Sequence, residues 1–227
     1  MKTLFFIALV LVLGDAMANP LKDTSDALES EWAHIYYGMP KAQQALAYQQ
    51  LLEKTATLAG QYPGNPDILY WQAVVKANYA EYQNELTALH AIYEVRDLLQ
   101  KVIAINPKTM EGSAYVVLGT LYHLTPPWPV AFGDDNEANK LLQTALKINP
   151  DGIDSNYFYG KYLMSQDRIE EAERHFAKAI GAPVRTEQVY VDIELKKEAK
   201  MALENVRQPK SGELKKTFSS LFAVGIK

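Results

Sequence analysis

Apolar and polar positions follow the period of an α-helix along almost the whole chain. Apolar residues recur three and four positions apart, which places them on one face of a helix, and no segment keeps the period of two that marks a half-buried strand. Clusters of proline and glycine separate the helical runs. The pattern predicts an all-α protein with helices over 26–37, 41–60, 68–82, 86–105, 110–124, 134–148, 153–165, 168–180 and 187–207.

A short motif, Ile-Asn-Pro, ends two of these runs, at 105–107 and at 148–150. Each motif follows a triplet of apolar residues spaced by four and then three positions, and a third triplet has the same spacing. The spacing is typical of the second helix of a tetratricopeptide repeat, a helix–turn–helix unit of about 34 residues. The triplets are Val95, Leu99 and Val102, then Ala138, Leu142 and Ala145, then Ala172, Phe176 and Ala179.

Two glycines set the register of the repeats. Gly160 precedes Ala172 by 12 residues, whereas Gly119 precedes Ala138 by 19, so seven residues are inserted in the earlier repeat. A small residue at these positions lets the paired helices approach closely. We therefore predict a tetratricopeptide-type helical-hairpin solenoid of three to four imperfect repeats over 19–207, in which 187–207 is a C-terminal capping helix that shields the last apolar face.

The first 18 residues have the features of a signal peptide: Lys2, an apolar run over 4–13, and a small-residue cleavage site at Ala16-Met17-Ala18. The run is too short to span a bilayer, and no later stretch reaches about 18 apolar residues. We predict export to the periplasm with cleavage after Ala18 and no lipid anchor, with a retained signal anchor as the alternative. Residues 208–227 form a basic tail, either partly ordered or docked through its apolar residues.

Composition narrows the functional classes. The chain has no cysteine, which excludes disulfides and thiolate metal sites, and its net charge of −4 does not predict a nucleic-acid interface. The four histidines lie in separate segments without metal-ligand spacing, and no phosphate loop or nucleophile elbow occurs. We predict no enzyme activity, no metal and no cofactor. The histidines are His34, His90, His123 and His175.

The inserted segment, 125–135, carries three prolines around Trp128 and then Phe132-Gly133-Asp134. Prolines make such a loop stiff and non-helical, and Asp134 can cap the following helix. Two hypotheses stay open for Trp128 and Phe132. They form the wall of a ligand pocket or an oligomer contact, or the loop folds back onto its own repeat.

The segment 118–122, Pro126-Pro127, the Phe132-Gly133-Asp134 turn and the run from Ala138 to Ala145 resemble a family of exported proteins. These are the T components associated with tripartite ATP-independent periplasmic (TRAP) transporters, and the resemblance covers 67–207. It implies a periplasmic helical scaffold that forms a homo-oligomer, a trimer around a central pore, and passes apolar solutes to a transporter's receptor protein. Members are often lipid-anchored, whereas no cysteine follows the signal here.

In such a stack the first helices of the repeats line the concave face. Lys161 is the one basic residue of this face. The expected members of the face are Asp67, Tyr70, Val74, Ala77, Ser113, Val116, Thr120, His123, Asp154, Tyr157, Lys161 and Met164. A clamp for a peptide carboxylate needs several donors, so an apolar small molecule or an apolar peptide helix fits better. The candidate ligand- or partner-binding residues are Tyr70, Val116, Thr120, Tyr122, His123, Trp128, Phe132, Tyr157, Lys161 and Met164.

Two functions follow as hypotheses. The first is an accessory of a periplasmic solute-uptake system, which binds an apolar small ligand and a receptor protein. The alternative is a protein–protein adaptor in cell-envelope assembly that has no small ligand. Neither hypothesis involves nucleic acid or a membrane span, and an ordinary concave surface with the real contact elsewhere is equally compatible with the pattern.

Overall fold

The computed structural model describes residues 20–186 and 188–207, and these form an all-α structure. The predicted signal peptide, 1–18, and the basic tail, 208–227, lie outside the described residues. The helices are α1 (Pro20–Ala33), η1 (His34–Gly38), α2 (Lys41–Gln61), α3 (Pro66–Ala80), α4 (Glu85–Ile105), η2 (Thr109–Gly112), α5 (Ser113–Leu124), α6 (Asp135–Ile148), α7 (Ile153–Ser165), α8 (Ile169–Gly181) and α9 (Val189–Arg207).

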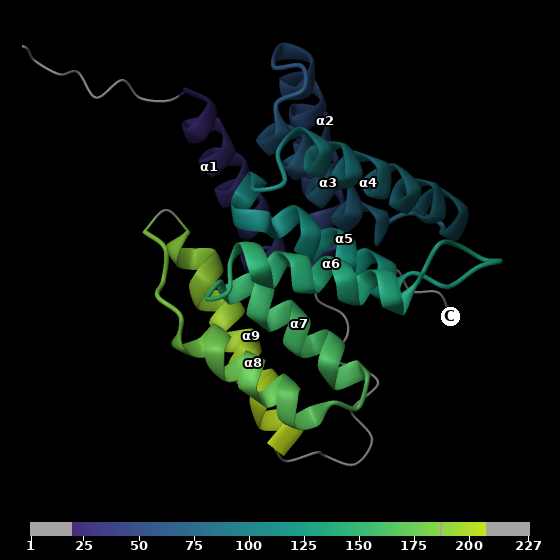
Figure 1. The fold of residues 1–227 in the computed structure, drawn as a ribbon. Helices are drawn as coiled ribbons and strands as arrows, with labels where there is room; N and C mark the ends of the chain where they lie inside the picture. The colour runs from purple at the N-terminus through teal and green to yellow at the C-terminus, as the bar shows by residue number, and fades with distance from the viewer. Residues whose placement is uncertain (1–19, 187, 208–227) are drawn as a thin grey trace, which may run out of the picture.

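Consecutive helices pair as hairpins, α3 with α4, α5 with α6 and α7 with α8, and each hairpin packs against the next (Figure 1). Helix α2 packs on α3 at one end of this stack, and α9 packs on α7 and α8 at the other. Helix α1 crosses back to contact α3. The first helices of the three hairpins, α3, α5 and α7, therefore lie between the two end helices.

Asn and Asp side chains cap three of the helices, and Asp134 is the one that the sequence predicted in this role. The Asn65 side chain accepts a hydrogen bond from the Ile68 amide at 3.0 Å, and Asn84 accepts from the Thr87 amide at 3.1 Å. Asp134 accepts hydrogen bonds from the amides of Asn136 and Glu137, at 2.8 and 3.1 Å. Each bond satisfies an amide that has no partner inside the first turn, which fixes where these helices begin.

The apolar triplets lie in the core. All nine of their side chains are buried. Gly160 faces Phe176 so closely that a Cβ atom there would lie 2.8 Å from the ring, and a Cβ at Gly119 would lie 2.8 Å from Leu142 Cγ. The two glycines are thus packing positions between paired helices, as the register predicted.

Two helical runs differ from the sequence prediction. The first begins at Pro20 and continues as the π-helical turn η1, rather than covering 26–37. The run predicted over 110–124 is divided, because Met110, Glu111 and Gly112 have positive φ values of 48°, 55° and 91°. Left-handed residues cannot continue a right-handed helix, so the α-helix begins only at Ser113.

Within 20–186 and 188–207, no helix combines the length and the apolar composition that crossing a membrane requires.

Candidate functional site

A pocket lies where α1, α3, α5, α7 and α9 converge. Its volume is about 80 Å³, and its walls are mainly apolar and aromatic. Val74, Val116 and Phe158 face it from the first helices of the three hairpins, and Leu195 closes it from α9. Helices α1 and α9 thus cover the side of the pocket that α3, α5 and α7 leave open.

Aromatic rings form the wall nearest α1. Trp71 lies at the centre of a chain of contacts, 5.8 Å from Trp32 and 5.2 Å from Tyr70 between ring centroids. Trp32 in turn meets Tyr37 edge to face at 6.1 Å. Trp32, Tyr70 and Trp71 are each less than a tenth exposed. These edge-to-face and tilted contacts hold the rings in place against one another.

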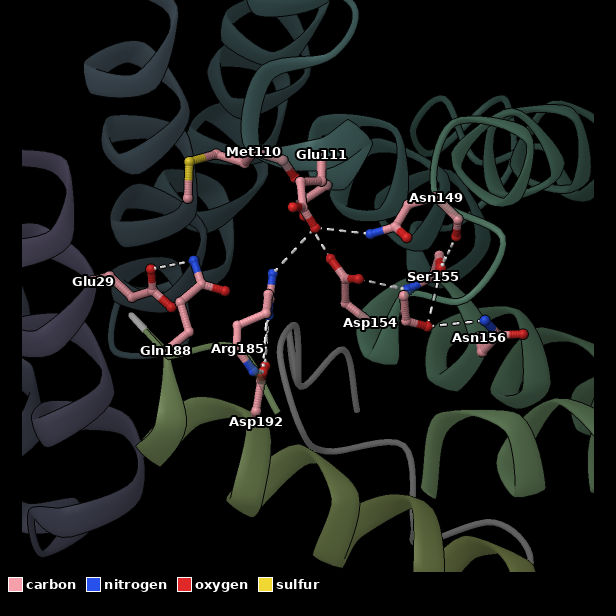
Figure 2. Close-up of polar contacts among 12 residues, drawn as sticks. Glu29, Met110, Glu111, Asn149, Asp154, Ser155, Asn156, Arg185, Gln188 and Asp192 are labelled. Atoms are coloured by element: carbon pink, nitrogen blue, oxygen red, sulfur yellow. Dashed lines mark hydrogen bonds and ion pairs between the residues drawn. The ribbon is translucent and has the colours of Figure 1, made fainter. Parts of the chain in front are cut away.

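Polar groups from both ends of the chain meet at the pocket (Figure 2). Glu29 on α1 accepts a hydrogen bond of 2.6 Å from Gln188 Nε2, just before α9. Arg185 lies between two acidic groups: its guanidinium bonds Asp192 at 2.6 Å and faces Glu111 at 3.8 Å. The Arg185 backbone amide also donates to Asp192, so a fully buried carboxylate fixes both ends of this residue.

The carboxylate of Asp154 forms the opposite polar side of the pocket. It accepts hydrogen bonds from the Ser113 hydroxyl and from the Ser155 amide. Ser113 is the first residue of α5 and Asp154 lies in the first turn of α7. Both side chains come from helix N-termini, where the positive end of the helix dipole favours a carboxylate.

The left-handed turn at Met110 and Glu111 shapes the rim. Its backbone carries two non-glycine residues in a conformation that costs roughly 1 kcal/mol or more each. The turn brings Met110 to the pocket wall and Glu111 toward Arg185, and Asn149 Nδ2 donates to Glu111 at 2.9 Å. Surrounding contacts therefore hold a strained segment at the site.

A wider hollow adjoins the pocket and shares Met110, Arg185 and Gln188 with it. Its volume is about 550 Å³, and its other walls are mostly polar. We call the two spaces the inner pocket and the outer vestibule. The vestibule walls include Lys22, Ser25, Asp26, Asn65, Asp67 and Glu111.

Burial shifts the protonation of groups around the site. Loss of solvent raises the pKa of Glu29 to about 7, although the Arg185 charge and the Gln188 hydrogen bond act against this rise. Burial also raises the pKa of Asp67 and of the Tyr70 hydroxyl above their ordinary values. Burial lowers the pKa of Lys161, which the charge of Glu198 partly offsets. At neutral pH Glu29 is therefore divided between its charged and neutral forms.

Outside the inserted loop, the structure divides the predicted binding residues between three places. Tyr70 and Val116 line the inner pocket, and Tyr157 donates to Glu198 beside it at 2.8 Å. Thr120, His123 and Lys161 line a separate space of about 20 Å³, roughly enough for one water molecule. Tyr122 and Met164 are partly buried against the apolar core.

The inserted loop separates the two residues that the sequence grouped. Phe132 packs edge to face on Tyr93 and Tyr122, at 5.0 and 5.2 Å, and Arg96 lies over its ring. Trp128 is 84% exposed at the tip of the loop. Neither residue lines the inner pocket.

Sequence patterns did not predict Glu29, Trp32, Trp71, Arg185 or Gln188 as site residues. Glu29 and Trp32 lie on α1, Trp71 lies on a buried face of α3, and Arg185 and Gln188 lie between α8 and α9, all outside the concave positions that a regular repeat defines. Asp154 and Val74 were expected on the concave face and do line the pocket. Among the described residues, no group of three or more histidine, aspartate or glutamate side chains is placed to hold a metal ion.

No known protein family matches the chain, and no curated protein is significantly similar to it.

Proposed function

We propose that this protein is a non-enzymatic solute-binding protein, in which a stack of tetratricopeptide-type hairpins encloses a small organic molecule. The observation that carries the proposal is the inner pocket, whose walls combine aromatic rings with buried polar groups and which shares three lining residues with the outer vestibule. Apolar walls with a few fixed polar groups are characteristic of small-molecule sites. The vestibule, at about 550 Å³, has the size range of such sites, roughly 300–1,000 Å³.

The repeat assignment rests on spacing and burial together. Each of the three triplets is buried in the second helix of a hairpin, and Gly119 and Gly160 lie against the opposing helix. In this proposal the protein is exported to the periplasm and delivers its solute to a receptor protein of an uptake system. The resemblance to the T components of TRAP transporters motivates that setting, including assembly as a homo-oligomer.

Native mass spectrometry of the full chain, purified from expressing cells, tests solute binding. We expect a small-molecule mass that is retained under native conditions and released on denaturation. Val116→Phe fills the inner pocket from α5 and should abolish retention. Val130→Phe changes an exposed valine, 59% accessible, in the inserted loop and should leave retention intact. An equal retained mass in both variants would contradict the pocket as the binding site.

A second candidate function is a protein–protein adaptor. The exposed Trp128 and Val130 favour it, because large apolar side chains at a loop tip are common anchors in protein interfaces. If no solute is retained by the native protein while Trp128→Ala loses a protein partner, the adaptor function is the better account.

A further inference from the structure

The aromatic walls and acidic side chains of the inner pocket favour one chemical class of solute. This inference rests on the proposed solute-binding function. We propose that the solute carries a small organic ammonium group, which sits against the aromatic wall of the inner pocket and is balanced by the carboxylate of Asp154. The rest of the solute extends into the outer vestibule.

The aromatic wall supplies the first part of the argument. Trp32, Tyr70 and Trp71 are joined ring to ring, tilted by 44° and 75° rather than stacked in parallel. Several ring planes thus border one small space. The negative face of an aromatic ring attracts a cation, and this attraction is strongest where water is excluded, as at rings less than a tenth exposed. An alkylated ammonium group also buries its methyl groups against such a wall.

The charge balance of the pocket points to the same class of ligand. Of the pocket-lining residues that the structure describes, Glu29, Asp154 and Glu198 are acidic and only Arg185 is basic. The Arg185 guanidinium is hydrogen-bonded to Asp192 and also faces the carboxylates of Glu111, Asp154 and Glu29. An anionic ligand would therefore be repelled by the acidic side chains of the pocket. The one basic side chain among these lining residues, Arg185, is already paired with a carboxylate of the protein.

Asp154 is the carboxylate best placed to balance a bound cation. Its hydrogen bonds come from a hydroxyl and a backbone amide, which are neutral donors, so they orient the carboxylate without cancelling its charge. The Arg185 guanidinium acts on Asp154 through its charge, whereas its side-chain hydrogen bonds go to Asp192. Glu198 instead supports the charge of Lys161, and Glu29 is bonded to Gln188 with part of its charge removed by burial.

Size sets the last constraint. The inner pocket, at about 80 Å³, is close to half of the roughly 150 Å³ cavity known to hold benzene, so it accepts a group of only a few non-hydrogen atoms. The vestibule is larger and is lined by both polar and apolar groups, and it suits the remainder of the molecule. The buried indole N–H of Trp32 has no acceptor among the described residues, and a ligand hydroxyl would provide one.

Isothermal titration calorimetry of the full chain tests the charge requirement with matched probes. Choline is compared with its neutral isostere, in which carbon replaces the ammonium nitrogen, and n-butylammonium is compared with butanol. We expect at least one ammonium probe to bind about tenfold or more tightly than its neutral partner. Asp154→Asn keeps the shape of the side chain and should remove most of that preference. Asp151→Asn, at an exposed position three residues earlier, should leave it unchanged.

Other outcomes would overturn the inference in distinguishable ways. Equal or tighter binding of the neutral probes, or an unchanged preference in Asp154→Asn, would show that charge does not select the ligand, while solute binding itself would stand. If no probe binds but native mass spectrometry still finds a retained molecule, the ammonium class is wrong and the proposed function survives. If no probe binds and nothing is retained, both proposals fail.

Discussion

Glu29 illustrates how a single buried carboxyl couples this fold to pH. Its side chain lies between α1 and the start of α9, where loss of solvent raises its pKa from 4.5 to about 7. The folded protein therefore holds this proton more tightly than the unfolded chain does. As the pH rises from about 4.5 through about 7, ionisation of Glu29 increasingly opposes folding, and the effect levels off at higher pH.

We predict that Glu29→Gln stabilises the protein only at neutral and alkaline pH. Gln is uncharged and can still accept the hydrogen bond from Gln188. The gain in the free energy of unfolding should be near zero below about pH 4 and reach roughly 3 kcal/mol above about pH 8. Urea denaturation of both proteins across this range measures it. Glu53→Gln, at an exposed position in α2, should show no such growth with pH; a gain at Glu29 that is independent of pH would contradict the assigned cause.

At the scale of the helix and hairpin, close approach between α7 and α8 depends on the absence of a side chain at Gly160. Gly60, near the end of α2, has open space where its Cβ would be. The two glycines therefore differ in whether the folded structure has room for a side chain. Gly160 is constrained by packing, whereas Gly60 only adds backbone freedom to the unfolded chain.

We predict opposite effects when these glycines are replaced. Gly160→Leu should overpack the hairpin against Phe176 and lower the free energy of unfolding by about 1–3 kcal/mol. Gly60→Ala should raise it by about 0.4–1 kcal/mol, because Ala restricts the unfolded chain. Thermal and urea unfolding report both changes. A melting temperature that is unaltered by Gly160→Leu would show that the hairpin register is wrong.

The helices themselves were largely predictable, because their apolar periodicity and capping residues act locally. The run over 153–165 agrees with α7 at both ends, and 86–105 differs from α4 by one residue. The turn at Met110 and Glu111 was not predictable. Both residues are good helix formers, and their left-handed conformation is imposed by contacts with Ser25, Asn149 and Arg185 from other elements.

At the scale of the whole molecule, the inserted loop projects from the stack between α5 and α6 (Figure 1). Phe132 anchors its base against α4 and α5, whereas Trp128 stays at the exposed tip. Apolar surface held out in this way suits an intermolecular contact rather than the core.

We therefore predict that Trp128→Ala separates assembly from stability. The free energy of unfolding should change by less than about 0.5 kcal/mol, as for other exposed positions. The molar mass in solution, measured by light scattering during gel filtration, should fall from that of an oligomer to that of a monomer. Phe132→Ala should instead destabilise the fold, by up to about 3 kcal/mol. A monomeric parent protein, or an unchanged molar mass in Trp128→Ala, would remove the loop from the oligomer contact.

The site was only partly predictable because it belongs to no single repeat. Tyr70, Val116 and Asp154 were predictable, since helical spacing alone places them on the concave face, and all three line the pocket. Glu29 and Gln188 are 159 positions apart, and no local pattern shows that they meet. Their contact depends on how many hairpins lie between them and on how far each hairpin is rotated relative to the one before it.

That contact limits how the chain can evolve. Open solenoids gain or lose repeats freely, because each unit touches only its neighbours. Here the bond between α1 and the start of α9 closes across the intervening hairpins, so an added hairpin would carry Gln188 and Arg185 away from Glu29 and open the inner pocket. Duplication or loss of a hairpin should therefore be rare among proteins that keep this site, whereas insertions between the helices of a hairpin, such as the one at Trp128, are accommodated outside the closed stack.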